Sequence, residues 1–227
     1  MSEQIALKLS AGRRPWLLPM EVAFFVVIFV AQQRHLLPVS KIPYLFVVCW
    51  LSLRLRGLGW RDMGLGLFRS WPVTLGLGLV LGVALESLQL FATQPFIAWV
   101  TGKGPNLSSY RQLAGNPRLL AVTLLLVWVL AAFGEELVYR GFVMNRVAEF
   151  GNRTKAAWAV SLLVMSIVFG FAHYDQGITG IIDEGLMGFL YGLAYLGCNR
   201  TLAVPIIAHG LQDTVDLVLL FLGKYPG

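Results

Sequence analysis

Six ionisable residues in the C-terminal half of the chain have the types and spacing of a hydrolytic site. Glu135 and Glu136 are adjacent, and they follow an almost continuous apolar run from Leu119 to Leu130. A charge at the centre of a membrane helix costs about 3 kcal/mol on insertion scales, so a buried acidic pair needs partners or a function. The other candidates follow in chain order as Arg140, His173, His209 and Asp213.

Helical geometry predicts different roles for the two adjacent acids. Glu136 and Arg140 are four residues apart, so they can form an ion pair on one face of a helix. Glu135 points about 100° away from Glu136 and needs a partner on another helix. We therefore expect Glu136 to be the structural acid and Glu135 to be the reactive one.

His173 is the predicted partner of Glu135. The midpoint between these two positions is residue 154, which lies in the polar turn 151–155. An antiparallel hairpin about this turn would place Glu135 and His173 at similar depth. His209 and Asp213 are again four residues apart, on one face of the last apolar stretch.

A carboxylate beside an imidazole in a water-limited cavity can act as a general base toward water. Glu135 would accept the proton, His173 would orient the water or share its proton, and His209 would donate to a developing oxyanion. This chemistry predicts hydrolysis of a peptide bond by activated water. The sequence contains neither Gly-x-Ser-x-Gly nor His-Glu-x-x-His, so it does not support a serine hydrolase or a zincin.

The composition indicates that membrane helices position these residues. The 227 residues are 57% hydrophobic and only 13% charged, whereas a soluble domain carries about 25% charged residues. We therefore predict an all-α, polytopic membrane helical bundle with about seven transmembrane helices, formed by residues 1–227 as a single integral membrane domain. The net charge of +6 fits membrane orientation and does not indicate nucleic-acid binding.

Glycine, proline and polar residues divide the apolar stretches from one another. The stretch 41–53 is short for a membrane span, so it is tilted, thin or re-entrant. The loop 101–117 is rich in glycine and proline, which disfavours a helix there. The predicted spans are residues 16–37, 41–53, 71–100, 118–150, 156–173, 177–197 and 201–222.

The basic residues predict an orientation. With seven spans and the N-terminus inside, eleven Lys and Arg residues lie on the cytoplasmic side and six lie outside, while Arg140 lies within a span. Omitting the stretch 41–53 would invert every later segment. With the N-terminus inside, the polar residues 1–15 form a short cytoplasmic tail.

Other residues within the spans have simpler interpretations. Gly76, Gly78 and Gly82 let the third span approach a neighbour closely. We expect Glu21 to snorkel toward the membrane surface, and Glu86 and Gln89 either to form interhelical hydrogen bonds or to support the site. Asp183 and Glu184 are expected in interfacial solvent. The remaining predictions concern Cys49 and Cys198, expected to be small buried residues without a disulfide or a metal.

Three motifs in a fixed order carry a family resemblance. Glu135-Glu136-x-x-x-Arg140, Phe169-x-x-x-His173 and His209-x-x-x-Asp213 resemble the motif series of the CAAX prenyl protease and bacteriocin-processing family (CPBP or Abi) of intramembrane proteases. The resemblance covers residues 118–222, the expected catalytic core. It implies an all-helical endopeptidase in which Glu135 and His173 activate water. The last motif then forms the oxyanion site.

The last motif differs from that of the prenyl-protease branch, which has Asn where Asp213 stands. An amide can donate to an oxyanion, but an ionised Asp cannot, so Asp213 is either protonated or orients His209. This difference weakens a direct transfer of prenyl-protein specificity. The family resemblance implies a metal-independent mechanism with no cofactor, although two Glu and two His could bind zinc.

The expected partners are the lipid bilayer and a peptide substrate, with no nucleic acid. The substrate would be a prenylated or hydrophobic C-terminus, or a peptide tied to bacteriocin production or immunity. The expected location is a prokaryotic plasma membrane, in which the chain is multi-pass. Two alternatives stay open: a proton- or ion-coupled transporter that uses buried Glu, His and Asp, and a catalytically silent scaffold.

Overall fold

The chain folds into helices joined by turns, as predicted. The computed structural model describes residue 12 and residues 14–66 and 70–226, and this part of the chain contains no strand. The α-helices are α2 (Leu18–Gln33), α3 (Ile42–Leu55), α4 (Trp71–Leu88), α5 (Gln94–Thr101), α6 (Pro117–Leu126), α7 (Asn145–Phe150), α8 (Lys155–Phe171), α9 (Gly177–Gly197) and α10 (Ala203–Phe221).

Shorter helical segments connect or extend these helices. Two are π-helical, η3 (Gln89–Thr93) and η5 (Val127–Met144), and they make α4–η3–α5 and α6–η5–α7 continuous. The others are 3₁₀ helices, η1 (Pro15–Leu17), η2 (Trp60–Met63), η4 (Ser108–Leu113) and η6 (Tyr174–Gln176). The turn at η4 corrects the expectation that residues 101–117 contain no helix, because glycine and proline flank this segment but do not interrupt it.

Several helices are long and apolar enough to cross a membrane. In the described part of the chain these are Pro15–Gln33, Trp71–Thr101, Pro117–Phe150 and Ala203–Phe221. A fifth candidate is α8 together with η6 and α9, which are bent by 57° at their junction. The multi-pass helical bundle is therefore confirmed, but the count of seven spans is not. α3 is shorter than the candidate spans, and α8 and α9 are long and apolar enough to cross a membrane only when they are taken together.

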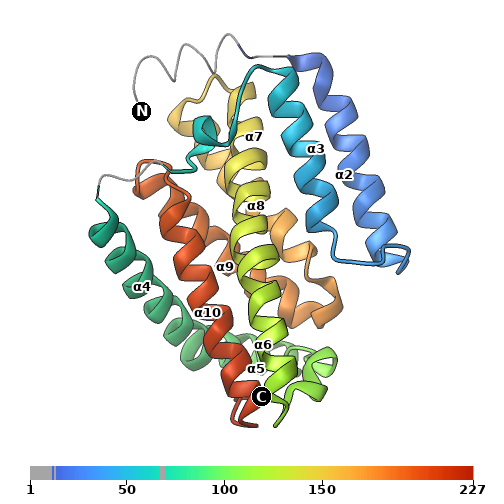
Figure 1. Cartoon of the computed structure of the whole chain (residues 1–227), viewed down its shortest axis with the longest axis vertical. Helices are drawn as coiled ribbons and strands as arrows, with labels where there is room; N and C mark the ends of the chain where they lie inside the picture. Colours follow the sequence, from blue (N-terminus) through green and yellow to red (C-terminus); the bar gives the residue numbers. More distant parts are fainter. Residues whose placement is uncertain (1–11, 13, 67–69, 227) are drawn as a thin grey trace.

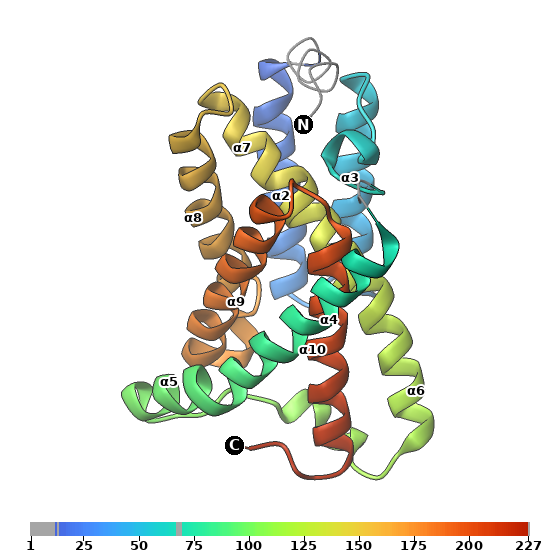
Figure 2. The ribbon, with the colours of Figure 1, turned by 90° about the vertical axis from the view of Figure 1, so that its left-hand side faces the viewer.

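The long helix α6–η5–α7 runs through the length of the molecule (Figure 1). α10 packs along it, and α4 crosses α10 on the outer side (Figure 2). A Cβ atom at Gly78 would lie 2.6 Å from Ile207 Cβ, and one at Gly82 would lie 2.9 Å from the Ala208 carbonyl oxygen. These two glycines permit the crossing, whereas Gly76 faces open space and does not contribute to it.

A buried ionic cluster joins the first helices to α7. Glu21 is only 5% exposed and accepts hydrogen bonds from Ser52 Oγ at 2.5 Å and Arg146 Nε at 2.6 Å. Glu149 pairs with Arg56 and, at 2.9 Å, with Arg146. The expectation that Glu21 snorkels is therefore wrong, because a cation from α7 satisfies it inside the protein.

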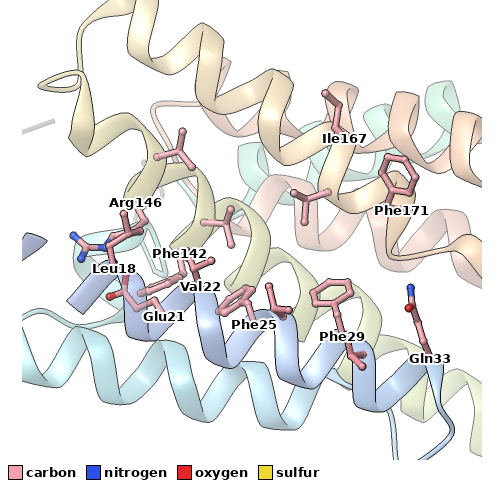
Figure 3. Close-up of a pocket in the computed structure, with 15 residues that line it drawn as sticks. Leu18, Glu21, Val22, Phe25, Phe29, Gln33, Phe142, Arg146, Ile167 and Phe171 are labelled. Carbon is pink, nitrogen blue, oxygen red and sulfur yellow. Dashed lines mark hydrogen bonds and ion pairs between the residues drawn. The ribbon is translucent and has the colours of Figure 1, made fainter. Parts of the chain in front are cut away.

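An apolar groove of about 430 Å³ lies between α2, η5 and α8 (Figure 3). Phe25, Phe29 and Phe171 contribute to its walls, and the Glu21–Arg146 pair lies at one end. The groove shares no lining residue with the cavity that contains the predicted catalytic side chains.

Asp183 is also buried rather than solvated at an interface. Asp183 is 2% exposed, and its carboxylate accepts hydrogen bonds from Gln89 Nε2 at 2.7 Å and Thr93 Oγ1 at 2.9 Å. Gln89 thus forms the interhelical hydrogen bond that was one of its two predicted roles. The expectation for Asp183 is wrong because its donors come from the π-helical turn of a distant helix.

The orientation stays a prediction. Three of the basic residues on which it depends, Lys8, Arg13 and Arg69, lie outside the described residues.

Candidate active site

His173 occupies the break between α8 and α9. Its ring Nδ1 is 2.9 Å from the Phe169 carbonyl oxygen. A carbonyl oxygen only accepts, so Nδ1 carries the proton of this hydrogen bond and Nε2 is the acceptor of the neutral ring. Lys41 Nζ donates to the Ala172 carbonyl oxygen at 3.3 Å, so side chains satisfy two carbonyls where the helix ends. The break therefore fixes both the position and the tautomer of His173.

The predicted Glu136–Arg140 pair is present and completely buried. Arg140 Nη1 donates to Glu136 Oε1 at 2.7 Å, and Arg140 Nη2 donates to the Gly188 carbonyl oxygen at 3.1 Å. The guanidinium carbon is 4.4 Å from the centre of the Phe169 ring, a cation–π distance. His209 Nδ1 is 3.0 Å from the same Glu136 oxygen. Glu136 therefore links η5 to α10 through His209, and Arg140 links the pair to α9 through Gly188.

Glu135 points elsewhere, into a cavity of about 190 Å³. The residue is 6% exposed, and within the described part of the chain its carboxylate makes no hydrogen bond or ion pair. His173, His209 and Asp213 line the same cavity. The hairpin does bring Glu135 and His173 to one place, although they do not bond directly. A cavity of this volume has room for water between them.

His209 is held on three sides. Its Nδ1 faces Glu136, its Nε2 is 3.5 Å from Asp213 Oδ2, and its ring stacks on Tyr191 with centroids 5.1 Å apart. Only Nε2 can therefore reach a substrate. For it to donate while Nδ1 donates to Glu136, the ring must carry both protons. The contact with His209 favours the orienting role among the two roles predicted for Asp213.

Sequence reasoning missed two acids that line this cavity. Asp216 lies three residues after Asp213 and seven after His209, so helical spacing alone would have placed it on their face. Glu184 also lines the cavity, whereas it was expected in interfacial solvent. Glu184 lies on α9, which packs back along α8 and so brings this residue near the break.

The end of the cavity is covered by the loop after α5 and by the C-terminal residues. Tyr110 and Tyr225 both line it, and the Tyr225 hydroxyl donates to Gln94 Oε1 at 3.0 Å. The backbone N–H of Asn106 donates to the Gln176 carbonyl oxygen at 2.9 Å. The Asn106 bond ties the loop to the segment that follows His173, and the Tyr225 bond ties the C-terminal residues to α5.

The two Glu and two His considered for zinc do not form a ligand set here. Glu136 is bonded to Arg140 and His209, and the Nδ1 of His173 is bonded to a carbonyl oxygen. Among the described residues, no group of three or more His, Cys, Asp or Glu has an arrangement suited to a metal ion. Metal independence stays a prediction that chelation must test.

A comparison with protein families identifies the segment that carries this site. Residues 117–215 match the model of the family described as Rce1-like, type II CAAX prenyl endopeptidase Rce1-like. No curated protein and no solved structure matches the chain. The match confirms the resemblance predicted from the motifs, and it indicates a protease of the CAAX type that acts on a peptide or protein in a membrane. The matched segment contains Glu135, Glu136, Arg140, His173, His209 and Asp213.

Proposed function

We propose that this chain, with its Rce1-like segment, is an intramembrane endopeptidase that hydrolyses a peptide bond with water activated by Glu135. One observation carries the proposal: Glu135 on η5, His173 in the break between α8 and α9, and His209 on α10 line one enclosed cavity. A purely structural role explains the Glu136–Arg140 pair, but it does not explain why an acid without a partner faces two imidazoles.

The reaction follows from the positions of the donors and acceptors. Glu135 removes a proton from water while the water oxygen attacks the carbonyl carbon of the scissile bond. His173 positions that water through its unprotonated Nε2. The carbonyl oxygen becomes an oxyanion and accepts a hydrogen bond from His209 Nε2. Collapse of the intermediate breaks the C–N bond, and the proton on Glu135 passes to the leaving nitrogen.

Glu136, Arg140 and Asp213 support this reaction without touching the scissile bond. Glu136 and Asp213 flank the two nitrogens of His209 and fix the ring plane. Arg140 in turn fixes Glu136. These three are positioning residues, and the reactive groups are Glu135, His173 and His209.

The substrate is a peptide with a prenylated or hydrophobic C-terminus, or one linked to bacteriocin production or immunity. The family match supports the first class, while Asp213 in place of Asn argues against a simple transfer of prenyl specificity. The proposed location is a prokaryotic plasma membrane.

Cleavage assays on protein purified in detergent test the proposal. The substrates are a farnesylated CAAX peptide and a library of hydrophobic peptides, and the variants are Glu135→Gln and His173→Ala. Asp175→Asn, a carboxyl-to-amide change at an exposed residue outside the cavity, is the matched control. Both active-site variants should lose about 10²-fold or more in kcat, the usual effect of removing general-base catalysis.

Full activity in either variant would refute the mechanism. Loss of activity on chelation, with recovery on adding zinc, would overturn metal independence. Proton-coupled flux in liposomes without any peptidase activity would favour the transporter instead.

A further inference from the structure

Three buried acids that do not line the cavity are supplied with donors. Glu21 receives hydrogen bonds from Arg146 and Ser52, and Glu149 pairs with Arg56 and Arg146. Glu136 pairs with Arg140, as described above. A buried carboxylate without a donor is costly, so this pairing is what stability requires.

The acids around the cavity break that pattern. Glu135, Glu184 and Asp216 line it, and none of them receives a hydrogen bond or an ion pair from an N–H group or a cation in the described part of the chain. The carboxyl group of Asp216 contacts that of Glu86, which does not line the cavity. Glu86 is 5% exposed, and both of its oxygens lack a donor.

Among the described residues, no Lys or Arg pairs with these acids. The residues that line the cavity include no Lys and no Arg, and the two imidazoles are already bonded to Phe169 and Glu136. The wall therefore has an excess of hydrogen-bond acceptors and of potential negative charge. The complementary ligand is a cation with several N–H groups, because each N–H can satisfy one acceptor.

We propose that Asp216 and Glu184 form a specificity subsite that binds a Lys or Arg side chain of the substrate next to the scissile bond, with Glu86 in contact with Asp216. The inference rests on the proposed peptidase function for the identity of the ligand as a peptide. It adds a preference that hydrophobic or prenylated C-termini do not explain. The substrate would then combine an apolar segment in the bilayer with one basic residue at the cavity.

Binding measurements separate this subsite from catalysis. Peptides with a single Lys scanned along an apolar sequence are compared with the same peptides carrying norleucine, which keeps the four-carbon stem and removes the ammonium group. Binding is measured by fluorescence anisotropy on the Glu135→Gln protein, so that no peptide is consumed. Cleavage of the same peptides is measured in parallel on protein with Glu135 intact.

At one position of the scan, Lys should bind about tenfold more tightly than norleucine, equivalent to about 1.4 kcal/mol. Asp216→Asn and Glu184→Gln, each added to Glu135→Gln, should reduce this ratio toward one. Asp175→Asn should leave the ratio unchanged. Size-exclusion profiles and thermal unfolding check that each variant is folded.

Equal binding of the Lys and norleucine peptides at every position would overturn the subsite. A Lys preference that survives both Asp216→Asn and Glu184→Gln would also overturn it. So would a preference that depends on added divalent metal and disappears with a chelator, because the acids would then hold a metal ion. A Lys preference in binding without any cleavage would support the subsite and contradict the peptidase function.

Discussion

Replacing Arg140 with Met should destabilise the protein severely. Arg140 is completely buried, and its guanidinium group bonds to Glu136 Oε1 at 2.7 Å and to the Gly188 carbonyl oxygen at 3.1 Å. Methionine keeps most of the apolar stem but removes the charge. Glu136 would then remain buried, with only His209 as a partner.

The expected loss follows from two contributions. Removing one partner of a buried ion pair costs about 3–5 kcal/mol, because the other charge is left without compensation. The contact of the guanidinium with the Phe169 ring at 4.4 Å adds up to about 2 kcal/mol. We expect Arg140→Met to lower the free energy of unfolding by about 5 kcal/mol.

The double variant Glu136→Gln/Arg140→Met tests the cause of that loss. Glutamine keeps an oxygen that accepts from His209 Nδ1 and removes the uncompensated charge. Replacing both members of a buried pair is often close to neutral, so the double variant should recover to within about 2 kcal/mol of the parent protein.

Unfolding in mixed detergent and SDS micelles, followed by the fluorescence of the seven tryptophans, gives the free energies. The reasoning would be refuted by a loss below about 1 kcal/mol for Arg140→Met. It would also be refuted if the double variant were as unstable as the single one, since the two sites would then show no coupling.

Three further predictions concern other parts of the molecule. Gly78→Ala should cost about 1–3 kcal/mol in thermal unfolding because the added Cβ meets Ile207, whereas Gly76→Ala should cost nothing; equal losses would contradict the packing of α4 on α10. Burial raises the pKa of the Cys198 thiol, so maleimide labelling followed by mass spectrometry should be slow at pH 7 and accelerate as the pH rises, and fast labelling at neutral pH would contradict this. Glu135→Gln should leave the unfolding transition unchanged, and a large shift would mean that Glu135 also supports the fold.

The positions of the helices could be predicted from the sequence because their signals are local. Long apolar runs separated by glycine, proline and polar turns gave helix bounds close to those of the structure, as in the stretch 177–197, which is the whole of α9. The Glu136–Arg140 pair was also predictable, since spacing within one helix determines it. The number of spans was not, because the bend between α8 and α9 depends on how the two helices pack.

Contacts between distant parts of the chain could not be predicted. Glu21 is satisfied by Arg146, 125 positions away, and Asp183 by Gln89, 94 positions away. When the partner on another helix is unknown, an acid near the end of an apolar stretch is most simply predicted to lie in solvent. The bond from His209 to Glu136 was missed for the same reason, although both residues had been singled out.

The break after α8 places a proposed catalytic side chain, His173, where a helix ends. Carbonyl groups freed inside an apolar medium cost several kcal/mol each unless a donor reaches them. Lys41 supplies such a donor to Ala172, and His173 adds a second donor to the Phe169 carbonyl oxygen, which also accepts from the backbone N–H of Ala172 at 3.1 Å. Replacing His173 therefore removes a hydrogen bond at this helix end together with the proposed catalytic ring.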